Sequence, residues 1–152
     1  MDANLNDYQA MFALTNADFG KTILDCDTGL ARYSADVMAR GGQVLVCEPF
    51  SQKASLGFPA NQFQLALCLQ QFFLPESSGE RYLAKLLELC RVAGQVRIFL
   101  ATQDQKNVSQ LLGPLMMELQ SRNYGVEIRQ VSYGVGSVML RVWSQECAVK
   151  NA

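Results

Sequence analysis

The stretch that decides the fold is Ile-Leu-Asp-Cys-Asp-Thr-Gly-Leu-Ala at residues 23–31, followed by Gly-Gly-Gln-Val-Leu-Val-Cys-Glu-Pro at residues 41–49. Both stretches contain a short apolar run that ends in an acid, which is typical of a buried strand that opens into a loop. Between them, a helix is expected over 30–40, with Leu30, Tyr33, Val37 and Met38 on its apolar side. The order strand, helix, strand predicts two parallel strands joined by a crossover helix.

The rest of the chain repeats this alternation. Ser77 with Glu80 predicts the start of an amphipathic helix, and a second one is expected around 108–123. Pro114 should either lie in the first turns of this second helix or kink it, because an interior proline breaks a hydrogen bond. The last two predicted strands are joined by a short turn, which only an antiparallel hairpin allows. The fold class is therefore α/β, a mostly parallel sheet with a C-terminal antiparallel hairpin. Further strands are predicted at 63–68, 96–100, 126–131 and 137–143.

Composition narrows the class of protein. With 152 residues, 49% hydrophobic and 18% charged, residues 1–152 should form a single domain with its own core. A net charge of −1 with scattered basic residues gives no reason to expect nucleic acid or a membrane as partner. The chain shows no membrane span or signal peptide, so we expect it in the cytoplasm. It has no histidine, and its five cysteines form no metal-binding pair, so they should be mostly buried.

Three predicted strand ends should meet in one crevice, because ligands of open parallel sheets bind beyond the carboxyl ends of the strands. The expected cofactor contacts there are Asp25, Asp27, Gly29, Glu48 and Cys68. Glu48 follows the glycine turn by about twenty residues, the spacing of an acid that accepts hydrogen bonds from both ribose hydroxyls. The two aspartates have no nearby Lys or Arg in the turn, which favours a ligand with a ribose and positive charge, such as S-adenosylmethionine.

Simpler interpretations of these residues stay open. Asp25 and Asp27 could serve only as helix-entry residues, since an acid near a helix N-terminus is stabilising. Glu48 could be a solvated loop acid, and Gly29 could serve only the tight turn. For Cys68 the simpler interpretation is a buried small hydrophobic residue. A reactive thiol is the other alternative, although no histidine is present to activate it.

Together the two opening stretches resemble the first two motifs of class I S-adenosylmethionine-dependent methyltransferases. They are more specifically similar to a little-characterised bacterial branch whose glycine-rich turn is reduced to one glycine, and the resemblance covers most of residues 8–144. It implies a Rossmann-like sheet of order 3-2-1-4-5-7-6 with strand seven antiparallel. It also implies S-adenosylmethionine as cofactor and methyl transfer to an unknown small-molecule acceptor.

The departures from that family carry expectations of their own. Asp27 stands where the family usually has glycine, and only residues 49–62 separate the second strand from the next, too few for a helix plus a strand. The family's third strand and its neighbouring helix should therefore be reduced or missing. Strand 43–47 then becomes an edge, for which we expect either a homodimer across it or cover from residues 50–62. The alternative function is a catalytically inactive protein of this fold that has lost the cofactor and acts as an oligomerising or partner-binding module.

Overall fold

The computed structural model describes residues 4–26, 28–47, 57–69 and 79–144, with residues 79 and 102–111 described in their backbone alone. Helices and strands alternate along the chain as the sequence predicted. In order they are α1 (Leu5–Phe12), η1 (Asp18–Gly20), β1 (Thr22–Cys26), η2 (Leu30–Tyr33), α2 (Ser34–Ala39), β2 (Gln43–Val46), β3 (Leu65–Leu69), α3 (Gly79–Val92), β4 (Gln95–Leu100), α4 (Thr102–Ser121), β5 (Tyr124–Gln130) and β6 (Val138–Ser144).

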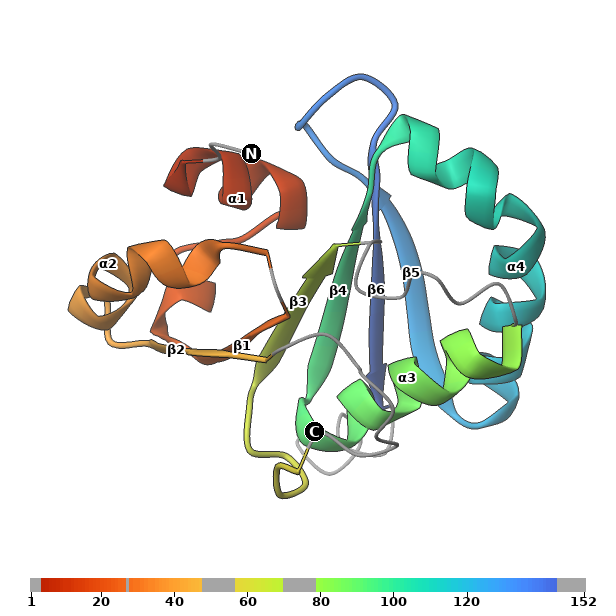
Figure 1. The fold of residues 1–152 in the computed structure, drawn as a ribbon, viewed down its shortest axis with the longest axis horizontal. Coiled ribbons are helices and arrows are strands. Elements are labelled where there is room, and N and C mark those ends of the chain that lie inside the picture. Colours follow the sequence, from red (N-terminus) through yellow and green to blue (C-terminus); the bar gives the residue numbers. More distant parts are fainter. Residues whose placement is uncertain (1–3, 27, 48–56, 70–78, 145–152) are drawn as a thin grey trace.

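The strands form one six-stranded sheet in the order β2-β1-β3-β4-β6-β5, which runs from left to right in Figure 1. The pairs from β2 to β4 are parallel, and β6 is antiparallel to both β4 and β5. If the third strand of the expected order is left out, β3 and β4 become strands four and five, and β5 and β6 become strands six and seven. The observed order then equals the expected one, and the antiparallel hairpin is confirmed.

Helices cover the two faces of the sheet. In Figure 1, α1 and α2 lie on one face, and α3 and α4 lie on the other. Each face has its own apolar cluster, and β1 and β3 contribute side chains to both because successive residues of a strand point to opposite faces. Residues Ile23–Cys26 and Leu65–Cys68 are buried throughout, as the near-continuous apolar runs of parallel strands predict.

Some predicted elements differ in detail. The helix expected over 30–40 is a 3-10 turn followed by α2, with Leu30 and Val37 buried as predicted. Met38, expected on the same apolar side, is 65% exposed. Strand β3 begins at Leu65, and Phe63 makes only an isolated bridge. Boundaries shift in this way because tertiary hydrogen bonds, not the apolar pattern, decide where an element ends.

One of the two alternatives for Pro114 is wrong, and one helix was not predicted. Helix α4 begins at Thr102, so Pro114 lies in its interior and not in its first turns. Gly113 precedes the proline and has no Cβ, which reduces the clash that disfavours helix before proline. Helix α1 was missed, although Asn4 and Asp7 form a capping box at its start.

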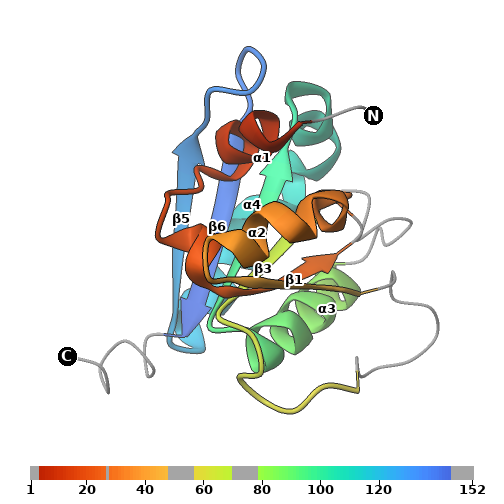
Figure 2. The same cartoon turned by 90° about the vertical axis from the view of Figure 1, so that its left-hand side faces the viewer.

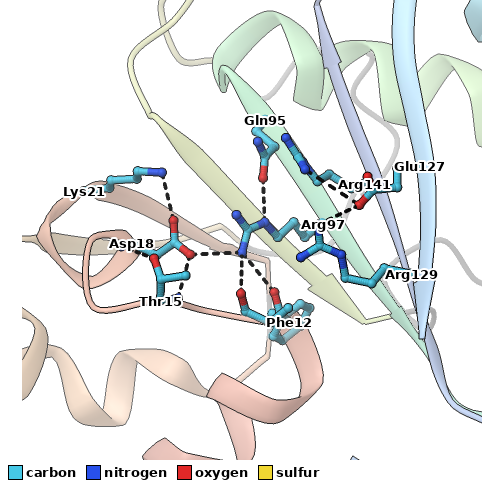
Figure 3. A network of polar contacts seen from close by, with 10 residues as sticks. Phe12, Thr15, Asp18, Lys21, Gln95, Arg97, Glu127, Arg129 and Arg141 are labelled. Atoms are coloured by element: carbon cyan, nitrogen blue, oxygen red, sulfur yellow. Dashed lines mark hydrogen bonds and ion pairs between the residues drawn. The ribbon is translucent and has the colours of Figure 1, made fainter. Parts of the chain in front are cut away.

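A buried ion pair fastens the N-terminal segment to the sheet (Figure 3). Arg97 on β4 donates to Asp18 at 3.2 Å and to the carbonyl oxygen of Phe12 at 2.9 Å. Asp18 also accepts from the Thr15 amide and the Lys21 ammonium, each at 2.8 Å. Burial alone would raise the pKa of Asp18, but the bonds from Lys21 and Thr15 and the charge of Arg97 lower it to about 2. This carboxylate therefore stays charged and holds the segment on the sheet.

The cysteine prediction is confirmed for the four cysteines that the structure describes. Cys26, Cys47, Cys68 and Cys90 are all free and buried. Burial raises the pKa of the Cys90 thiol to about 12 and that of Cys26 well above its ordinary value, so both stay protonated. No helix within the described ranges is both long and apolar enough to cross a bilayer.

Candidate functional site

The strand order reverses between β1 and β3. From β1 the chain crosses to β2 on one side, and β3 then pairs with β1 on the other side. Cys26 and Cys68, near the carboxyl ends of these strands, lie directly opposite each other. Ligands of open α/β sheets bind beyond the carboxyl ends at such a reversal, so the turn after β1 is the candidate site.

Asp25 fixes the shape of this turn. Its side chain is 1% exposed and accepts hydrogen bonds from the Thr28 amide at 2.8 Å, from the Thr28 hydroxyl and from the Ala31 amide at 3.0 Å. The Thr28 hydroxyl in turn accepts from the Leu30 amide at 3.3 Å. These bonds satisfy backbone donors at the start of η2, as the helix-entry interpretation of Asp25 expects. The carboxylate thus braces the turn from inside the protein.

Gly29 adopts the left-handed conformation, with φ at +91°. A Cβ added there would lie 2.7 Å from the Tyr8 hydroxyl, which is too close for any real side chain. That hydroxyl donates to the Thr28 carbonyl oxygen at 2.7 Å. Both the backbone conformation and the neighbouring tyrosine therefore require glycine at this position.

Arg32 brings a positive charge to the turn. Its guanidinium donates to the Gly29 carbonyl oxygen at 3.2 Å and to the Tyr8 hydroxyl at 3.3 Å. Burial raises the pKa of Tyr8 and outweighs the opposing effect of Arg32, so the phenol stays neutral and able to donate. The expectation that no Lys or Arg lies near the turn is wrong, because one helical turn brings Arg32 back over Gly29.

The structure brings two of the predicted site residues together and separates a third from them. Asp25 and Gly29 belong to one hydrogen-bonded turn. Cys68 is fully buried in the apolar cluster beneath α3, on the opposite face of the sheet from Asp25. Asp27 and Glu48 lie outside the described residues, so their predicted contacts stay predictions.

Sequence reasoning missed Tyr8 and Arg32 as parts of the site. Tyr8 follows the capping pattern of Asn4 and Asp7, which predicts a helix but not what that helix covers. Arg32 comes three residues after Gly29, a spacing at which a helical side chain can reach back to the first turn.

A pocket of about 370 Å³ lies between α3 and α4, away from this turn. It is lined by Glu80, Tyr82, Leu83, Pro114, Leu115, Glu118 and Arg122. In the part of the chain that the structure describes, no three His, Cys, Asp or Glu side chains gather in a way that could hold a metal ion.

Comparisons with known proteins identify the fold. No family model matches the chain, and no curated protein matches it. Among solved structures, a methyltransferase dependent on S-adenosylmethionine from Aquifex aeolicus is 17% identical, with a TM-score of 0.54 over 82% of this chain and 81% of that one. One from Methanosarcina mazei is 10% identical, with a TM-score of 0.53 over 95% and 99%. Mitomycin 7-O-methyltransferase is 10% identical, with a TM-score of 0.60 over 92% and 53%. At such low identity these likenesses show the fold.

Proposed function

We propose that this chain, which has the class I methyltransferase fold, binds S-adenosylmethionine beyond the carboxyl ends of β1 and β3 and transfers its methyl group to an acceptor that is unknown. The observation that carries the proposal is the braced glycine turn at the point where the strand order reverses. A turn held in one conformation before the ligand arrives loses little entropy on binding, which favours affinity.

The charges of the described turn complement those of this cofactor. Asp25 is buried and its oxygens accept from the turn itself, whereas Arg32 is exposed beside Gly29. S-adenosylmethionine carries a carboxylate together with an ammonium and a sulfonium group, so a turn with both signs of charge suits it. In this proposal Arg32 and the Gly29 turn hold the amino-acid end of the cofactor, and Glu48 holds the ribose.

The chemistry asks little of the protein beyond alignment. S-adenosylmethionine supplies an activated methyl group on its sulfonium, so the chain's task is to orient the acceptor toward that group. The absence of histidine is compatible with such a reaction, because positioning needs no general base from that residue.

Thermal unfolding tests the proposal. S-adenosylmethionine or S-adenosylhomocysteine at a hundred times its dissociation constant stabilises a protein by about 2.7 kcal/mol, which should raise the Tm of a domain of this size by roughly 5–10 °C. Glu48→Gln should abolish most of this shift, and Glu80→Gln, at an exposed acid of α3, should keep it. A flat melt at millimolar cofactor would overturn the proposal.

One observation favours the second candidate function, a module that has lost the cofactor and pairs with another chain. Strand β2 lies at the edge of the described sheet with exposed apolar side chains. The same melt separates the two functions, because the module would show no shift with either ligand while keeping its self-association.

A further inference from the structure

Strand β2 forms an open edge of the sheet. Within the residues that the structure describes, it pairs with β1 alone, and Figure 1 shows it at the end of the sheet opposite β5. Leu45 is 40% exposed and Val46 is 53% exposed, although both lie in a strand whose neighbour β1 is buried. An edge of this kind offers both backbone groups and apolar side chains to another strand.

The hydrogen bonds of β2 show which backbone groups face outward. The Gln43 amide donates to Lys21 at 3.0 Å, and the Cys47 amide donates to Asp25 at 2.9 Å, both toward β1. Backbone groups of a strand alternate in direction from one residue to the next, so those of Val44 and Val46 point away from the sheet. A partner strand must therefore pair with these two residues.

We propose that the β2 edge binds the β2 edge of a second copy of this chain, antiparallel about a two-fold axis, so that Val44 lies opposite the partner's Val46 and Leu45 lies opposite the partner's Leu45. This register makes Val44 and Val46 the hydrogen-bonded positions, with about four backbone bonds across the axis. It joins the two sheets into one continuous sheet.

The faces of the sheet select the same register. Residues directly opposite each other in a ladder share a face, and Val44 and Val46 both lie on the α2 face, since their β1 partners Ile23 and Asp25 do. Pairing Val44 with its own copy would place Val46 opposite Gly42 of the partner subunit. Gly42 already donates its amide to Val37 at 3.0 Å and offers no apolar side chain. Pairing Val46 with its own copy would place Val44 opposite Glu48 of the partner subunit, a charged residue. The proposed register pairs each of Val44, Leu45 and Val46 with an apolar residue.

The small size of the edge sets the expected strength. Stable interfaces bury at least about 1,000 Å², and two strands of four residues offer far less. The dimer should therefore be weak and depend on concentration. Its concentration dependence distinguishes this dimer from an obligate dimer. Because the association is weak, a single substitution at the two-fold axis should be enough to disrupt it.

Sedimentation velocity across about 10 µM to 1 mM protein tests the proposal. The native chain should shift from monomer to dimer, and Leu45→Lys should weaken the association by about tenfold or more, because it places two like charges opposite each other. Ile128→Lys is the matched control, since Ile128 is 42% exposed on β5 at the other edge. A monomer at every concentration overturns the proposal, and so does a dimer that Ile128→Lys weakens and Leu45→Lys leaves intact.

Cross-linking tests the register. At the axis, Leu45→Cys should form a disulfide between two chains on mild oxidation, because residues opposite each other in an antiparallel pair lie within disulfide distance. Ile128→Cys should not. Cross-linking of Ile128→Cys in place of Leu45→Cys would overturn the proposal, as would cross-linking of neither.

Circular dichroism of each variant shows whether it is folded, and a variant that does not fold is replaced by Val46→Pro, which removes one outward amide from the edge. A dimer sensitive to that substitution supports the proposal, and one insensitive to it counts against it. The melt with S-adenosylmethionine is run on Leu45→Lys, so loss of the dimer and loss of the cofactor are read separately.

Discussion

Asp18 and Asp25 are both buried carboxylates, 3% and 1% exposed, yet their partners differ in kind. Asp18 lies between two cations, Lys21 and Arg97, and ties the N-terminal segment to β4. Asp25 accepts from neutral amide and hydroxyl groups of its own turn. The first contact therefore stabilises the fold through charge, and the second fixes the geometry of the site. Helix α1 contacts both regions. Its Phe12 carbonyl oxygen accepts from Arg97, and its Tyr8 hydroxyl donates to Thr28 in the turn.

The largest loss of stability should come from removing the ion pair between Arg97 and Asp18. Arg97→Met leaves the Asp18 charge and the Phe12 carbonyl oxygen buried with fewer donors, which should lower the free energy of unfolding by about 3–5 kcal/mol. Arg129→Met is the control, because Arg129 is 49% exposed in an ion pair with Glu127, and exposed pairs contribute about 0–1 kcal/mol. Urea unfolding measures both values. Equal losses in the two variants would contradict this contrast.

The stability that the Asp18 ion pair contributes should depend on pH. The pKa of Asp18 is lowered from 3.8 to about 2, so its contribution is fully present above about pH 4 and is lost as the pH falls through about 2. The difference in unfolding free energy between the native chain and Asp18→Asn should shrink by about 2 kcal/mol over this range. Denaturant unfolding at pH 5, 4, 3 and 2 measures it, and a difference that stays constant would show that the ion pair does not set this pKa.

The sequence predicted the elements that build the sheet better than the contacts that build the site. Apolar runs such as Leu65–Cys68 predicted buried strands, because a strand that is buried on both faces needs apolar residues at almost every position. The contact of Tyr8 with Thr28 joins residues twenty positions apart, and nothing in either local pattern indicates it. The same holds for Asp18 and Arg97. Long-range polar contacts depend on how elements pack, and a pattern within one element cannot predict them.

The structure also adds physical reasons for glycine at position 29. Gly29 was predicted as a cofactor contact, or as a residue that serves only the tight turn, and the structure shows that the Tyr8 hydroxyl and a left-handed backbone each require glycine there. Charge was misjudged for a related reason. Arg32 stands three residues beyond Gly29 in the sequence, and only the helical turn brings its guanidinium back to the two aspartates' turn.

The smallest expected change in the free energy of unfolding distinguishes the contact with the Tyr8 hydroxyl from the left-handed backbone as reasons for glycine at position 29. Gly29→Ala should cost more than backbone strain alone, because its Cβ would lie 2.7 Å from the Tyr8 hydroxyl. Tyr8→Phe removes that hydroxyl, so Gly29→Ala should be about 1 kcal/mol less destabilising in a Tyr8→Phe background. Gly41→Ala is the control, because Gly41 has the same φ of +91° and nothing within 4 Å of an added Cβ.

A double-mutant cycle from urea unfolding measures the coupling, which should be near zero for Gly41. Coupling at Gly29 alone would assign the excess cost to Tyr8 and show that helix α1, through a single hydroxyl, helps to set the shape of the turn. Additive effects at both glycines would leave the left-handed backbone as the whole reason for glycine, and α1 would then be a cover for the site without influence on its geometry.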